Sequence, residues 1–186
     1  MTKARLLASA CALLLAACGK LNNLPSYGLV SGFTLTDENG RPFGAANLNG
    51  KIWVADFFFT TCTGPCPRMS TQMNGVQNAV RPFPDVQLVS FTVDPATDTP
   101  PVLAAYARRY KADPARWHFL TGPLDTMNRL ARTSFMLGEV DGTRQHSTRF
   151  VLVDGKGRIR GYYLTAEKES IPQLLDDIQT LRKESS

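Results

Sequence analysis

The sequence predicts an α/β domain, and two observations carry the prediction. First, strand-like and helix-like segments alternate: an apolar run over residues 52–59 precedes helical spacing over residues 68–80, and a β-rich run over residues 86–93 follows. Second, Cys62 and Cys66 stand where the first apolar run becomes a helix. Alternating strands and helices favour a largely parallel sheet covered by helices.

The other segments add a hairpin at each end of the domain. Two short strand-like pieces, 33–36 and 41–43, flank an Asn-Gly turn, which is typical of a β-hairpin. A second hairpin is predicted near the C-terminus, around Asp154-Gly155-Lys156-Gly157. The remaining predictions are a helix ending near residue 110, a strand over 116–120, a helix over 124–132 and a closing amphipathic helix over 171–181.

The first residues predict export. Lys3 and Arg5 precede an apolar stretch that ends in Leu-Ala-Ala-Cys18, and that stretch is too short to span a bilayer. This end resembles a bacterial lipobox, so we expect residues 1–17 to be a lipoprotein signal peptide and Cys18 to carry lipid. An ordinary signal peptide and an uncleaved anchor are the alternatives. Residues 18–31 are then a tether, and residues 32–182 form one domain at a membrane, facing the periplasm or another extracytoplasmic space.

The cysteine count isolates one pair. Of the four cysteines, Cys11 lies in the signal peptide and Cys18 is assigned to lipid, which leaves Cys62 and Cys66. In an oxidising compartment this pair tends to close into a disulfide. Loss of residues 1–17 lowers the net charge from +5 to +3, because the segment holds two basic residues and no acidic one. No basic run interleaved with aromatic residues suggests nucleic-acid binding.

A thiol pair at the carboxyl end of a central strand is the thioredoxin arrangement, but two features depart from it. The cysteines are separated by three residues, and no proline occurs between Pro123 and Pro172 to face the pair. His146 stands ahead of the late strand instead. Two thiolates and an imidazole suit copper as Cu(I) or Cu(II), although the residues alone leave a surface-loop histidine equally open. Asp94 ends a strand at the same sheet edge and is a candidate neighbour.

Other residues near the pair have structural interpretations. Asp56 lies inside the first apolar run, where we expect a salt-bridged or strand-end carboxylate; an acid beneath the thiols is the alternative. Met69 and Met73 are expected to fill the core rather than bind metal. His118 is expected to be a core or strand-edge residue. The N-terminus of the following helix is expected to lower the thiol pKa values.

A basic patch follows the second predicted helix. It comprises Arg108, Arg109, Lys111 and Arg116. A solvated helix end is the default interpretation, since cations are favourable there, and a docking surface is the alternative.

The chain closely resembles the SCO/SenC family of copper chaperones for cytochrome c oxidase assembly. The matching stretches are Phe-Thr-Thr-Cys-Thr-Gly-Pro-Cys-Pro (59–67), Val-Asp-Pro-Ala-Thr-Asp-Thr-Pro (93–100) and His-Ser-Thr (146–148) with the strand that follows. The resemblance implies a thioredoxin-like fold in which Cys62, Cys66 and His146 bind copper, with Asp94 near the metal site or a partner. One departure is Thr63-Gly64-Pro65 between the cysteines, where the family usually has Pro-Asp-Val or similar.

Two functional classes follow from the resemblance. The first is a membrane-tethered metallochaperone that delivers copper to the Cu(A) site of cytochrome c oxidase subunit II, or to another copper protein. The second is a thiol–disulfide oxidoreductase acting on the oxidase's copper-site cysteines or on other exported proteins. The two classes differ in their requirement for His146, because only the copper carrier needs this residue. A peroxidase, which would use one cysteine and not Cys66, is a more distant third.

Overall fold

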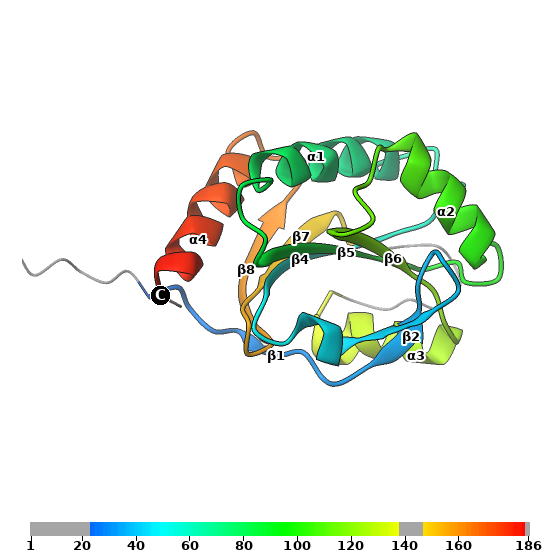
Figure 1. The fold of residues 1–186 in the computed structure, drawn as a ribbon, viewed down its shortest axis with the longest axis horizontal. Helices are drawn as coiled ribbons and strands as arrows, with labels where there is room; N and C mark the ends of the chain where they lie inside the picture. The colour runs from blue at the N-terminus through cyan, green and yellow to red at the C-terminus, as the bar shows by residue number, and fades with distance from the viewer. Residues whose placement is uncertain (1–22, 138–146, 185–186) are drawn as a thin grey trace, which may run out of the picture.

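A six-stranded mixed sheet forms the centre of the computed structural model, which describes residues 23–137 and 147–184 (Figure 1). Its strand order is β1-β8-β7-β4-β5-β6. The strands are β1 (Gly28–Leu29), β4 (Ile52–Phe58), β5 (Val86–Thr92), β6 (Trp117–Leu120), β7 (Arg149–Val153) and β8 (Arg158–Leu164). β4, β5 and β6 run parallel, and β7 pairs antiparallel with β4. Every residue of β4 and β5 is buried, as expected for central strands covered on both faces.

Helices and a hairpin cover the two faces of the sheet (Figure 1). One face carries α1 (Cys66–Ala79), α2 (Pro100–Arg109) and α4 (Ser170–Glu184), whose apolar residues share one core with the sheet. The other face carries the hairpin of β2 (Thr34–Thr36) and β3 (Pro42–Gly44), a 3-10 turn (Ala45–Leu48), α3 (Leu124–Arg129) and a π-helical turn (Leu130–Ser134). The predicted α/β plan and both hairpins are therefore confirmed.

Element boundaries differ from the predicted ones by a few residues. α1 begins at Cys66 rather than Arg68, because Pro67 supplies a preset φ in the first turn. α4 is longer at its C-terminal end than predicted. α2 begins after Thr99 with proline in its first turn and ends at Arg109, close to the predicted end near residue 110. In the part of the chain that the structure describes, none of the helices is long and apolar enough to cross a membrane.

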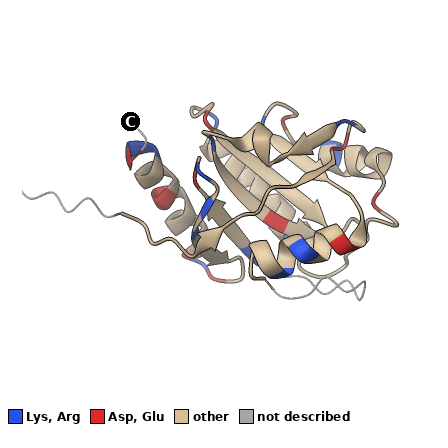
Figure 2. Ribbon diagram, turned by 90° about the horizontal axis from the view of Figure 1, so that it is seen from below, with Lys and Arg blue, Asp and Glu red and all other residues tan. Residues whose placement is uncertain are grey.

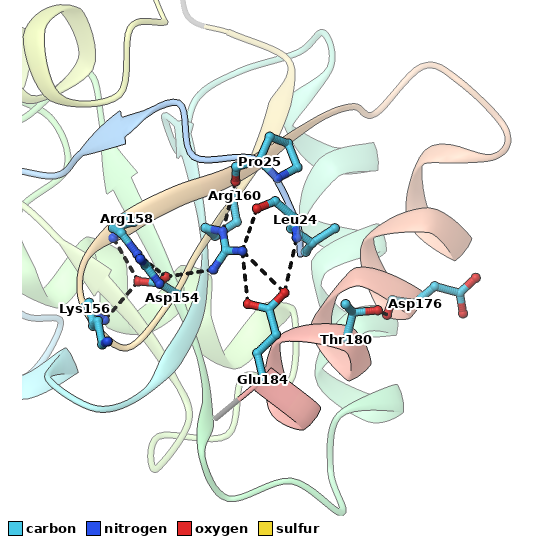
Figure 3. Close-up of polar contacts among 9 residues, drawn as sticks. All are labelled: Leu24, Pro25, Asp154, Lys156, Arg158, Arg160, Asp176, Thr180 and Glu184. Carbon is cyan, nitrogen blue, oxygen red and sulfur yellow. Dashed lines mark hydrogen bonds and ion pairs between the residues drawn. The ribbon is translucent and has the colours of Figure 1, made fainter. Parts of the chain in front are cut away.

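The N-terminal segment is bound to the domain from Leu24 onward (Figure 3). Arg160 donates from Nη2 to the Leu24 carbonyl at 2.6 Å and from Nε to the Pro25 carbonyl at 2.9 Å. The same guanidinium forms ion pairs with Asp154 and Glu184, each at 3.0 Å. Because β1 also pairs with β8, part of the stretch assigned to the tether belongs to the sheet.

The contacts of Arg160 lie at the end of the sheet where β4 begins. Ile159 in β8 is paired with Val153 in β7, which is paired with Trp53 near the start of β4. β4 spans seven residues, so this end lies about 20 Å from the end where β4 gives way to Cys62. We call the two ends the anchor end (Leu24, Asp154, Arg160 and Glu184) and the thiol end (Cys62, Cys66 and the loops 59–65 and 93–99).

Candidate metal centre

The two cysteines lie at the carboxyl end of β4, as predicted. Cys62 sits in the loop after the strand, where its backbone N–H donates to the Phe59 carbonyl at 3.3 Å. Cys66 is the first residue of α1 and is fully buried, whereas Cys62 is half-buried. Gly64 lies against the Cys62 sulfur, and a β-carbon there would stand 3.9 Å from it. Both cysteines are free thiols in the structure, and the disulfide between them stays a prediction.

Burial controls the acidity of Cys66. It raises the pKa of this thiol far above its usual value, a hydrogen bond with the Cys62 side chain raises it further, and a backbone hydrogen bond at Phe59 opposes the effect. The expectation that the helix N-terminus lowers the pKa is therefore wrong for Cys66, because its sulfur is packed in the core. A metal that binds here must displace a proton from Cys66, so binding is linked to pH.

Asp56 is a buried acid on the same face of the sheet as α1. It alternates along β4 with Val54 and Phe58, which join the core beneath α1. The Ser90 hydroxyl donates to Asp56 at 2.6 Å, and burial raises the pKa of the carboxyl to about 7. Its charge also raises the pKa of Cys66. Within the described residues no ion pair forms at Asp56, so the salt-bridge prediction is wrong and the acid lies beneath the thiols.

The loop after β5 braces the cysteine loop through Asp98, a residue whose role the sequence did not reveal. Asp98 is fully buried and accepts hydrogen bonds from the Thr60 N–H at 3.1 Å and the Thr60 hydroxyl at 2.5 Å. The Thr92 hydroxyl also donates to Asp98. Asp94 follows β5 at the thiol end, as expected, and its N–H donates to the Thr92 hydroxyl at 3.0 Å. The Asp-Pro-x₂-Asp spacing was the available signal, but it equally suggests a helix cap.

His146 lies outside the described residues, so its placement as a ligand stays a prediction. The next residues, Ser147 and Thr148, lead into β7, which begins at the thiol end because it runs antiparallel to β4. Thr148 is held there by Thr165, whose hydroxyl donates to its carbonyl at 2.7 Å. Among residues 23–137 and 147–184, no three His, Cys, Asp or Glu side chains are grouped so that they could hold a metal ion.

The remaining candidates have structural roles. His118 packs on Phe43, with ring centroids 4.5 Å apart, and lies 3.3 Å from the Gln87 amide oxygen. Burial lowers its pKa. It is on edge strand β6 and faces the side of the sheet opposite to α1, so it does not join the thiols. Met69 and Met73 are fully buried in the core, which confirms the packing interpretation.

Comparison with known proteins now identifies the family. The SCO1/SenC family model matches residues 23–183. The chain belongs to the SCO1/SenC family. Two relatives are 31% identical to it: the SCO1 protein homolog of Bacillus subtilis over 176 residues, covering 90% of this chain and 91% of that protein, and a protein of Stutzerimonas stutzeri whose name proposes copper binding, over 170 residues, covering 83% and 80%.

Solved structures confirm the thioredoxin-like SCO fold. A SCO1/SenC family lipoprotein from Bacillus anthracis superposes with a TM-score of 0.78 and 31% identity, over 87% of this chain and 98% of that one. BsSco, described as a member of the Sco family of cytochrome c oxidase assembly proteins and as carrying a disulfide switch, superposes with a TM-score of 0.74 and 29% identity, over 86% and 95%.

In this SCO1/SenC domain a hollow opens beside Cys62. Its volume is about 450 Å³, and it lies between the loop 60–63 and the facing sides of α1 and α2. Tyr106, Arg109 and Tyr110 line its α2 side, and Pro67 lines its α1 side. A molecule that reaches Cys62 through this hollow therefore also meets two tyrosines and a guanidinium.

Proposed function

We propose that this protein is a membrane-tethered copper carrier that binds one copper ion at Cys62, Cys66 and His146 and passes it to the Cu(A) site of cytochrome c oxidase subunit II. The observation that carries the proposal is the pair of free thiols side by side at the carboxyl end of β4, where Cys62 is half-buried and lines a hollow. Relatives support a role in copper binding and oxidase assembly, since one is named for copper binding and another belongs to a family of oxidase assembly proteins.

The donor set suits copper as cargo. Thiolates favour Cu(I), and an imidazole extends the set to Cu(II). Structural zinc sites normally use four protein ligands, and Cys62, Cys66 and His146 make three. The half-exposed Cys62 offers a place where a ligand of the receiving protein can approach the metal, while buried Cys66 fixes the other side of the site.

A second function, thiol–disulfide exchange, is favoured by the hydrogen bond between the two thiols. In such an exchange a disulfide forms between Cys62 and Cys66, and the two electrons and two protons released reduce a disulfide in the client protein. The same oxidation removes the copper ligands. Copper carriage and reduction therefore compete for one pair, and the buried Cys66 thiol must lose its proton in either case.

The anchor end supports a particular orientation at the membrane. If Cys18 carries lipid, six residues of chain, at most about 20 Å, connect it to Leu24, which Arg160 holds at the anchor end. The thiols lie at the opposite end of the sheet. A domain tethered in this way presents Cys62 away from the membrane surface, where a soluble domain of a client protein can reach it.

An anaerobic copper titration of the reduced protein, with metal analysis, tests the copper proposal. We expect one Cu(I) per wild-type molecule, none for Cys62→Ser or Cys66→Ser, and loss of Cu(II) binding for His146→Ala. His118→Ala is the matched control and should bind copper like the wild type, because His118 faces the other side of the sheet. Wild-type protein that binds no stoichiometric copper would disprove the carrier function.

An insulin-reduction assay on the same variants separates the second function. A reductase should tolerate His146→Ala and lose activity with either cysteine variant. Full reductase activity in a wild-type protein that binds no copper would favour thiol–disulfide exchange over copper carriage as the function.

A further inference from the structure

The two chain segments that border the hollow carry basic residues and no acidic ones. No Asp or Glu occurs between Asp56 and Asp85, a stretch that contains the cysteine loop and α1. None occurs between Asp98 and Asp113, a stretch that contains α2. The two stretches carry five basic residues: Arg68, Arg81, Arg108, Arg109 and Lys111.

The opposite face of the domain does not share this pattern. The helix nearest the viewer in Figure 2 is α3, and it carries both signs of charge. On it Arg129 and Asp125 lie 3.9 Å apart as an exposed i,i+4 pair. α4 also mixes acidic and basic residues. Among the helices that the structure describes, only α1 and α2, which border the thiols, carry basic residues without acidic ones.

Within this surface Arg109 is placed to act on a ligand. Its guanidinium lies 5.6 Å from the centre of the Tyr110 ring, which orients it, and the side chain lines the hollow beside Cys62. No carboxylate of the described residues forms an ion pair with it. Arg116, by contrast, donates to the backbone carbonyls of Val80, Phe83 and Val86. It therefore fixes the chain after α1 and leaves the basic patch to Arg108, Arg109 and Lys111.

We propose that the α1–α2 surface beside Cys62 is the docking site for an acidic protein segment that carries the partner's own copper ligands. The proposal rests on the proposed function, because it states the chemistry of the protein that receives the metal. A segment whose cysteine approaches Cys62 continues across the hollow, where Tyr106 and Tyr110 contact its backbone and side chains. Carboxylates flanking that cysteine pair with Arg109 and Arg68, and such charge complementarity sets the encounter rate and the register.

The test is binding of short synthetic peptides to reduced, metal-free protein. The probe peptide has one S-methylated cysteine flanked by glutamates, and its matched control has glutamines in their place. We expect the glutamate peptide to bind roughly tenfold more tightly at low salt, since several exposed ion pairs form, and the preference to shrink as salt increases. The bound peptide should also slow alkylation of Cys62, because that thiol lines the same hollow.

Variants of Arg109 test whether the peptide binds at the α1–α2 surface. Arg109→Gln should weaken binding of the glutamate peptide roughly threefold to fivefold and reduce the protection of Cys62 at the same peptide concentration, whereas Arg109→Lys should retain most of both. Arg129→Gln on α3 removes an exposed arginine of the same kind and should change neither. Arg109 is exposed, so the variant should fold, and thermal denaturation checks that it does.

Three results would overturn the docking proposal. These are equal binding of the two peptides, an unchanged affinity in Arg109→Gln, or binding to phosphatidylglycerol vesicles through Arg109 with no preference for the glutamate peptide. The last result would assign the surface to the membrane. Because the peptide assay contains no copper, it succeeds or fails independently of the copper titration.

Discussion

Buried charged residues are stabilised in different ways at the two ends of the central sheet. At the anchor end Arg160 is 5% exposed and is neutralised by two carboxylates, Asp154 and Glu184. At the thiol end the buried acids Asp56 and Asp98 are held by hydroxyl groups and a backbone N–H. The described residues of the thiol end bring no cation into ion-pair contact with either acid.

This difference indicates which end is built to change. Ion pairs at the anchor end fix the entering chain and the last turn of α4 in one arrangement. Asp56 and Asp98 at the thiol end have no such ion-pair partner among the described residues, and the neighbouring thiol of Cys66 must lose its proton when a metal binds. Substitutions at the two ends should therefore separate stability from copper binding.

The largest effect is expected from Arg160→Met. Removing the guanidinium leaves Asp154 and Glu184 partly buried without their shared partner, which typically costs about 3–5 kcal/mol of unfolding free energy. Urea unfolding measures the loss, and copper stoichiometry should stay at one. Arg158→Met is the matched control: Arg158 pairs with the same Asp154 at 2.7 Å but is 44% exposed, so its loss should cost only about 0–1 kcal/mol. Equal losses would contradict the anchoring role of Arg160.

Asp56→Asn should change how stability depends on pH. The pKa of Asp56 rises from 3.8 to about 7 on folding, so its contribution is fully present below pH 3.8 and is lost as the pH rises to about 7. That separation corresponds to a ceiling of about 4 kcal/mol, and relaxation around the charge lowers it to roughly 2–3 kcal/mol. The asparagine variant should therefore lack this decline between pH 4 and pH 7.

The free energies of unfolding of the wild type and of Asp56→Asn must be compared at each pH. His118 has a lowered pKa, so its neutral form is favoured in the folded state and it adds stability as the pH rises toward 6.5. This opposite slope is the same in wild type and Asp56→Asn and cancels in the difference. Urea unfolding at several pH values gives that difference, and parallel curves would show that the pKa of Asp56 does not rise on folding.

Prediction from the sequence was most accurate for elements that depend on a single local property, such as burial or turn geometry. The apolar run of β4 and the turn residues of both hairpins predict those elements because burial and backbone geometry are local requirements. The cysteine pair was correctly placed for the same reason, since it follows a strand that has to be central. Predictions about helix ends were less accurate, because Pro67 in the first turn lets α1 begin at Cys66, two residues before the start that side-chain periodicity indicates.

The sequence could not predict which residues contact one another in the folded chain. Asp56 looks like half of a salt bridge, but its hydrogen-bond donor is Ser90, 34 residues away, and the distance is set by the register of β4 and β5. Arg160 has no sequence signal, although its contacts span up to 136 residues. The pKa of Cys66 was predicted in the wrong direction, because burial is a tertiary property and outweighs the helix terminus.

The smallest expected effect comes from Asp98→Asn, and it tests whether the thiol end positions its cysteines. The amide nitrogen cannot accept a hydrogen bond, so the variant loses part of the bonding from Thr60 and Thr92, at a cost of about 1–2 kcal/mol. Thr60 lies two residues before Cys62, so the loop should loosen and copper affinity should fall by up to about tenfold while stoichiometry stays at one. Competition titration against a Cu(I) chelator measures the affinity. Arg160→Met provides the reference, because it destabilises the protein more and should leave copper affinity unchanged. If Asp98→Asn loses stability without losing affinity, or if both variants lose affinity alike, the two ends do not differ in the way described above.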